Sequence, residues 1–90
     1  MTTVEKFEDI QAWQMVRELA KYVYVLTNKD EFKREFSLKD QIKRSSGSAM
    51  DNIAEGFDRS SSKDFGRFLY IAKGSASEVK SQLYRAFDQQ

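Results

Sequence analysis

Apolar residues recur along this chain at spacings of three and four, which is the period of an amphipathic helix. Three segments show the pattern, at residues 7–28, 38–57 and 63–87. The third has the longest repeat, close to a heptad pattern: Phe65, Phe68, Leu69, Ala72, Ala76, Val79, Leu83 and Ala86. Proline is absent and there are only four glycines, so strong helix breakers are scarce. The pattern predicts an all-α protein with three helices.

The ends of the first two predicted helices carry recognisable signals. Asn28 and Asp30 interrupt the first apolar repeat, and residues 29–36 are predicted to form a short charged connection. Ser37 is predicted to cap the second helix, because a serine hydroxyl can accept from a free first-turn N–H. Asp40 follows three residues later, where an acidic side chain favours a helix N-terminus.

Three helices with short connections predict an antiparallel up-and-down bundle in a single domain, residues 1–90. Ser61 or Ser62 is predicted to cap the third helix. That helix has no glycine, proline or basic residue in the turn that reaches Gln90, so it lacks a stop signal. We expect either that it frays there or that a fourth helix is missing, which would leave one groove of the bundle open.

A polar stripe on the second predicted helix is the first candidate for function. At about 100° per residue, its side chains fall within roughly 80° of one another, opposite the apolar positions. They are Gln41, Arg44, Ser48, Asn52, Glu55 and Arg59. A solvated face would hold one weak ion pair of about 0.3–0.5 kcal/mol. A surface pressed against another subunit or a ligand would instead explain why serine, asparagine and two glycines occupy a helix interior at some cost in stability.

A second such face is predicted on the third helix, opposite its apolar stripe. It carries Arg67, Ile71, Gly74, Glu78 and Arg85. Gly74 and the neighbouring Ser75 are small, so a second backbone could approach closely there. An intersubunit contact and a plain solvated face are both open interpretations of this surface.

Composition narrows the chemistry available to the chain. Histidine and cysteine are both absent, so the commonest general base, the commonest zinc ligand and any disulfide are missing. Glu55 with Arg44 or Arg59 has no activated nucleophile and no phosphate-binding glycine loop beside it in the sequence. We therefore expect a protein that is not an enzyme and that uses no cofactor, metal or small-molecule substrate.

The charge distribution bears on partners and location. The net charge is +1, which argues against general polyanion binding. Six basic residues nevertheless lie near the second connection, where they would either contact phosphates or merely solvate helix surfaces: Lys39, Lys43, Arg44, Arg59, Lys63 and Arg67. No apolar run approaches the ~20 residues that cross a bilayer, and the start does not resemble a signal peptide, so we expect a cytoplasmic protein without membrane contact.

Three ordered blocks of residues together resemble one family. They are 41–44 with Ser48, 52–57 and Arg59; then 68–75 with Glu78 and 82–83; and 7–10 with Trp13. This pattern resembles the proteins encoded within intervening sequences of bacterial 23S ribosomal RNA genes, also called the S23 ribosomal protein family. The resemblance covers essentially the whole chain.

The resemblance implies an antiparallel four-helix bundle that assembles into homo-oligomeric rings, typically pentamers. It also implies a relation to the accessory variability protein of diversity-generating retroelements, which is associated with nucleic acid and reverse transcriptase through a basic surface. The signature positions that match are Arg44, Asn52, Glu55, Gly56, Arg59, Gly74, Ser75 and Glu78. This chain departs from the pattern because it stops where the fourth helix should begin and is nearly neutral. The expected function is that of an oligomeric binding protein with an RNA or nucleoprotein partner; the alternative is a ring-forming protein–protein scaffold without nucleic acid.

Overall fold

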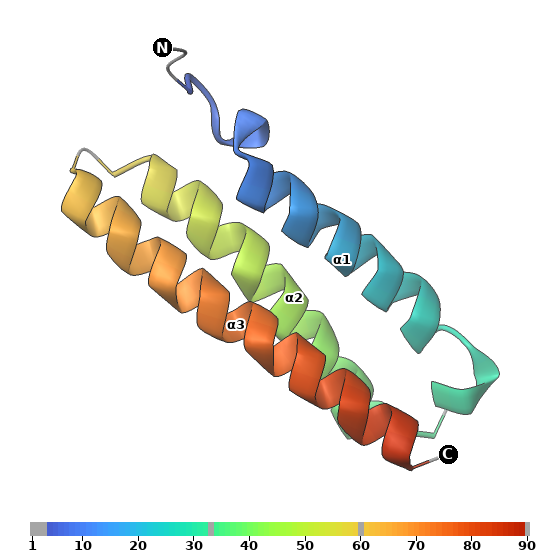
Figure 1. Ribbon diagram of the computed structural model, residues 1–90. Helices are drawn as coiled ribbons and strands as arrows, with labels where there is room; N and C mark the ends of the chain where they lie inside the picture. The colour runs from blue at the N-terminus through green and yellow to red at the C-terminus, as the bar shows by residue number, and fades with distance from the viewer. Residues whose placement is uncertain (1–3, 33, 60, 90) are drawn as a thin grey trace.

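The computed structural model describes residues 4–32, 34–59 and 61–89 of the ninety-residue chain. Within these ranges it contains three α-helices, two short 3₁₀ helices and no strand (Figure 1). The α-helices are α1 (Gln11–Thr27), α2 (Phe36–Phe57) and α3 (Ser62–Asp88), and the 3₁₀ helices span Phe7–Asp9 and Asp30–Phe32. The prediction of an all-α protein with three helices is confirmed.

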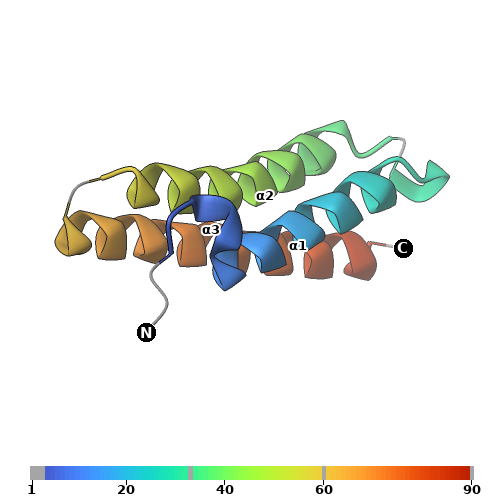
Figure 2. The same cartoon turned by 90° about the horizontal axis from the view of Figure 1, so that it is seen from above.

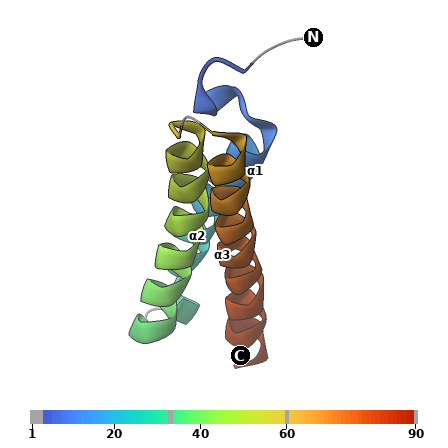
Figure 3. The same ribbon diagram turned by 90° about the vertical axis from the view of Figure 1, so that its left-hand side faces the viewer.

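α2 is the central helix of the fold. It packs along α3 over most of its length and also against α1, whereas α1 and α3 make few contacts with each other. The start of α1 and the α2–α3 connection lie at one end, and the α1–α2 connection and the end of α3 lie at the other (Figure 1). Figure 3 shows α2 and α3 side by side with α1 behind them. The molecule is elongated, with extents of 47, 19 and 17 Å.

The core gathers where all three helices meet, toward the end with the α1–α2 connection. Ile42 of α2 and Val79 of α3 are fully buried there, and Val23 of α1 is almost as inaccessible. Phe32, from the 3₁₀ helix between α1 and α2, closes the cluster. The apolar positions predicted for the second helix are buried as expected at Leu38, Ile42, Ala49 and Ile53, while Phe57 is half-buried.

The first helix begins later than the sequence pattern predicts. Residues 7–9 form a 3₁₀ helix, and Ile10 has an extended backbone, so α1 starts at Gln11 and not at Phe7. The apolar period continues through this break because the Phe7 ring packs edge-on against Trp13, with ring centroids 5.2 Å apart. The spacing of apolar residues in the sequence therefore could not distinguish a helix that starts at Phe7 from a short turn that folds back onto α1.

The predicted cap of the second helix is wrong. α2 begins at Phe36, its N-cap is Glu35, and that residue makes no side-chain cap hydrogen bond. Ser37 lies inside the first turn, where its hydroxyl accepts a hydrogen bond of 3.1 Å from Gln41 Nε2. The cap of the third helix is confirmed at Ser61, whose hydroxyl accepts from the Asp64 backbone N–H at 3.1 Å.

One buried polar atom has no partner among the described residues. Gln82 of α3 is only 7% exposed, and its Oε1 accepts no hydrogen bond there. An unsatisfied buried acceptor costs about 1–3 kcal/mol. We expect Gln82→Met, which keeps the side-chain length, to raise the free energy of unfolding by roughly 1–3 kcal/mol in urea titrations.

The same substitution at Gln41 serves as the control for Gln82→Met. Gln41 is half-buried, but its amide donates to Ser37 and accepts from Arg85. Gln41→Met therefore loses hydrogen bonds and should bring no gain. Equal effects at the two positions would contradict the assignment of a cost to the buried oxygen of Gln82.

Candidate functional site

The two polar faces predicted on the second and third helices meet along one line, which we call the polar seam: Gln41, Ser48, Asn52, Ser75 and Arg85. The Ser48 and Ser75 hydroxyls share a hydrogen bond of 3.0 Å between α2 and α3. Asn52 Nδ2 donates to the Ser48 carbonyl at 2.8 Å and to its hydroxyl at 3.0 Å. Arg85 donates to Gln41 Oε1 at 3.2 Å. The small polar residues of the stripe thus join two helices of one chain.

Exposed side chains flank the polar seam on both helices. On α2, Arg44 pairs with Asp40 at 3.1 Å and Arg59 pairs with Glu55 at 3.0 Å, each one helical turn apart. Such exposed pairs contribute at most about 1 kcal/mol each. On α3 the exposed flank consists of Ile71, Gly74 and Glu78. An intersubunit role for this surface, proposed from the sequence for Arg44, Ser48, Asn52, Glu55, Arg59, Ile71, Gly74, Ser75 and Glu78, stays a prediction.

The six basic residues predicted to contact nucleic acid do not form one patch. The stretch of α2 from Lys39 to its end at Phe57, just before Arg59, is about 27 Å long at the standard helical rise. The residues therefore divide between the start of α2, with Lys39, Lys43 and Arg44, and the α2–α3 connection, with Arg59, Lys63 and Arg67. The prediction grouped these residues near one connection because it did not take the length of α2 into account.

The two arginines at the α2–α3 connection are occupied with their own contacts, whereas Lys63 forms no salt bridge among the described residues. Both guanidinium groups lie over the Phe68 ring, Arg59 at 5.0 Å and Arg67 at 5.9 Å from its centroid. Arg59 also pairs with Glu55, and Arg67 lies 3.8 Å from an Asp64 carboxylate oxygen. Stacking and ion pairing leave these arginines less free to bind phosphate than their charge suggests.

The cluster at the start of α2 has a different character, and we call it the basic-aromatic patch: Tyr24, Phe36, Lys39 and Lys43. Among the described residues, neither lysine forms a salt bridge. Lys43 Nζ lies 5.4 Å from the centroid of the Tyr24 ring, which comes from α1. A shallow hollow of about 500 Å³ lies here, lined by Phe36, Ser37, Lys39, Asp40 and Lys43. The aromatic members were missed from the sequence because both occupy positions off the apolar period.

An open groove was expected from the sequence if a fourth helix is missing, and an apolar groove of about 460 Å³ lies between α1 and α3. It is lined by Tyr22, Leu26, Phe32, Lys80, Leu83, Tyr84, Ala86 and Phe87. Its lining residues come from α1, the Asp30–Phe32 3₁₀ helix and the C-terminal half of α3, and Figure 2 shows the ribbons of these elements. The groove exists because α1 and α3 both pack on α2 and make few contacts with each other. The apolar period predicted which residues would face a core. It could not show which of them would be left uncovered because no helix packs against them.

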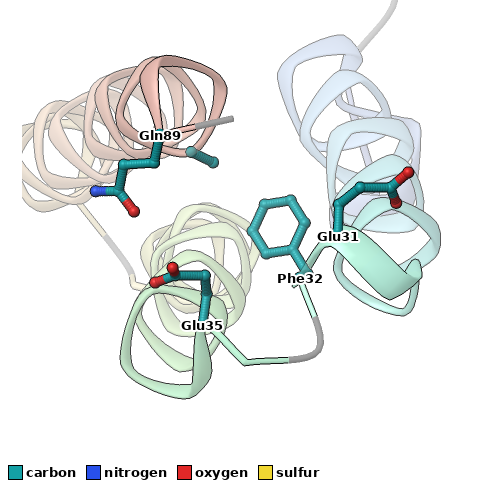
Figure 4. Close-up of a pocket in the computed structure, with 5 residues that line it drawn as sticks. Glu31, Phe32, Glu35 and Gln89 are labelled. Atoms are coloured by element: carbon teal, nitrogen blue, oxygen red, sulfur yellow. The ribbon is translucent and has the colours of Figure 1, made fainter.

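A smaller hollow of about 270 Å³ adjoins the groove at the same end of the molecule. It is lined by Glu31, Phe32, Glu35, Ala86 and Gln89. Figure 4 shows the Phe32 ring between the two glutamates, whose carboxylates point away from each other. Paired acid–base chemistry needs carboxyl groups directed at a common point, so this arrangement gives no sign of such a site.

Two further observations concern the parts of the chain that the structure describes. In those ranges, no three acidic side chains converge in a way that could hold a metal ion. Nor does any helix there combine the length and the apolar composition that crossing a bilayer requires.

The structure defines a class of small helical protein in which a helix pair, α2 and α3, is joined by a polar seam and a first helix packs on one side. The family model for the 23S rRNA-intervening sequence protein matches residues 8–90 of this chain. The chain therefore belongs to the 23S rRNA-intervening sequence protein family, as the sequence blocks indicated. No curated protein and no solved structure shows a significant match to it.

Proposed function

We propose that this protein is a non-enzymatic RNA-binding protein of the cytoplasm, with an RNA or a ribonucleoprotein as its partner. The observation that carries the proposal is the pair of lysines in the basic-aromatic patch, Lys39 and Lys43, which form no salt bridge among the described residues. Ammonium groups without a carboxylate partner can bind phosphates and release counterions. Arg44, Arg59 and Arg67 are already paired.

A fluorescence-anisotropy titration with structured RNA tests this proposal. Binding at micromolar protein should appear at roughly 50 mM salt and weaken toward about 200 mM. With only a few phosphate contacts the salt slope should be shallow compared with that of a strongly basic protein. Absence of binding at the lower salt concentration would contradict the proposed function.

We also propose that the complete assembly is an antiparallel four-helix bundle that forms a homo-oligomeric ring, a pentamer by resemblance. The apolar groove supports a fourth helix, because it leaves Tyr84 and Phe87 of α3 and Tyr22 of α1 largely exposed. A helix laid between α1 and α3 would cover these side chains and satisfy the packing of a bundle.

The second candidate function is a protein–protein scaffold that forms a ring without binding nucleic acid. The observation that favours it is the exposed face beside the polar seam, where an added Cβ at Gly74 meets no atom within 4 Å. We expect Gly74→Leu to stabilise one chain by its helix-propensity gain, up to about 1 kcal/mol, and to weaken self-association at least tenfold. Size-exclusion chromatography with light scattering measures the association state.

Gly66→Leu is the matched control for Gly74→Leu. Gly66 also lies in α3 with open space around it, but outside the predicted oligomer face. Its replacement should bring the same kind of helix-propensity gain and leave assembly unchanged. A wild-type monomer at concentrations of tens of micromolar would contradict the ring, and equal behaviour of the two variants would contradict the assignment of this face.

A further inference from the structure

The basic-aromatic patch exposes two aromatic rings beside its lysines. Phe36 is 73% exposed and Tyr24 is 62% exposed. A single exposed aromatic residue is ordinary on a protein surface. Two of them next to a pair of lysines without salt bridges are a different arrangement, because the rings offer flat apolar faces where the ammonium groups offer charge.

The backbone fixes the relative positions of these groups. Phe36, Lys39 and Lys43 are spaced three and four residues apart on α2, so they share one side of that helix. Tyr24 approaches from α1, and its ring is 5.4 Å from Lys43 Nζ. The hollow at Phe36, Lys39 and Lys43 is shallow and open to solvent.

Asp40 is the one carboxylate among the described residues that line this hollow. Its Oδ2 lies 3.1 Å from the Arg44 guanidinium, so its negative charge is balanced locally. A phosphate placed between Lys39 and Lys43 would therefore meet two unpaired cations and no unbalanced anion.

We infer that the basic-aromatic patch binds an unpaired nucleotide of single-stranded RNA, whose base stacks on Phe36 while Lys39 and Lys43 hold the flanking phosphates. This inference rests on the proposed RNA binding and names the form of RNA that the site takes. In a duplex, the faces of the bases are hidden in the stack, and recognition uses shape, phosphates and 2′-hydroxyl groups. An exposed ring gains its stacking energy only from a base that is free to leave the helix.

The α1 surface continues the same combination of groups away from the patch. Arg17 lies 5.5 Å from the centroid of the Trp13 ring. Trp13, Arg17 and Tyr24 are spaced four and seven residues apart, which places them along one side of α1. A strand that leaves the stacked base past Tyr24 therefore meets another cation and another aromatic residue along α1.

Two labelled RNAs test the inference by fluorescence anisotropy: an unstructured strand of roughly 12 nucleotides and a blunt duplex of the same sequence. We expect the single strand to bind wild-type protein at least tenfold more tightly than the duplex does. Phe36→Leu, which keeps an apolar side chain but loses the flat ring, should weaken single-strand binding by roughly tenfold or more. Its effect on duplex binding should be small.

Tyr70→Leu is the matched control, because Tyr70 is 79% exposed on α3 and lies outside the patch. It should leave both affinities unchanged, and circular dichroism should show that each variant keeps its helices. Equal binding of the two wild-type RNAs, or wild-type affinity in Phe36→Leu, would overturn the nucleotide site and leave RNA binding itself intact. If the protein binds neither the single strand nor the duplex, the proposed function is overturned, and the inference with it.

Discussion

Gly56→Ala should destabilise the protein by about 1–3 kcal/mol, although alanine is the better helix former. Gly56 is buried in the last turn of α2, where α2 and α3 approach each other. A Cβ at this position would lie 2.5 Å from Phe68 Cβ and 3.2 Å from a Phe65 ring carbon. The Phe68 Cβ is fixed to the α3 backbone, so no side-chain rotation relieves the overlap and the helices must move apart. Urea or thermal unfolding measures the loss.

Gly47→Ala is the matched control within the same helix. No atom lies within 4 Å of a Cβ built at Gly47. The substitution should therefore show only the helix-propensity gain, up to about 1 kcal/mol. Because alanine retains a Cβ, Phe68→Ala in the Gly56→Ala background should not restore stability. Stabilisation of both glycine variants would contradict the close approach of α2 and α3.

The overlap that a Cβ at Gly56 would make also explains why glycine occupies this position of the sequence signature. The sequence showed two glycines interrupting α2 at similar cost and could not separate them. Only the packing of α3 shows that Gly56 is needed for contact and that Gly47 is not. Periodicity along one chain carries no information about the distance between two helices, so this difference was beyond sequence reasoning.

The fold itself was largely predictable because its helices follow a clear apolar period. Ile42 and Val79 sit at predicted core positions and are fully buried. The errors occur at helix starts. There, a contact between Phe7 and Trp13 imitates the period before α1 begins. At the start of α2, Ser37 bonds to Gln41 within the helix and does not cap it.

The candidate site was predicted less well than the fold. Ser48 and Asn52 were expected on a face directed away from the chain's own core, but Ser48 joins α2 to α3 through Ser75, and Asn52 donates to Ser48. The basic residues were expected near one connection, but the length of α2 divides them between two ends of the bundle. Tyr24 and Phe36 lie outside every periodic pattern, so only the structure could place them beside Lys39 and Lys43.

The two lysines of the basic-aromatic patch should account for much of the affinity for RNA. A hydrogen bond to a charged group is worth roughly 1.5 kcal/mol or more. The double variant Lys39→Gln with Lys43→Gln should therefore bind single-stranded RNA about 100-fold more weakly at low salt. Its plot of log affinity against log salt concentration should also be shallower by about 1.4, because two phosphate contacts are lost.

The double variant Lys73→Gln with Lys80→Gln separates this site from an effect of net charge. Both lysines are exposed on α3, away from the basic-aromatic patch, and Lys80 lines the apolar groove. This variant loses the same two positive charges as the Lys39 and Lys43 variant, but from another surface. Long-range attraction alone would weaken binding equally in both double variants and would contradict a local site. A site at the start of α2 requires the large loss and the shallower salt dependence in the Lys39 and Lys43 variant only. Anisotropy titrations at several salt concentrations therefore decide whether this small, nearly neutral protein holds RNA at one place.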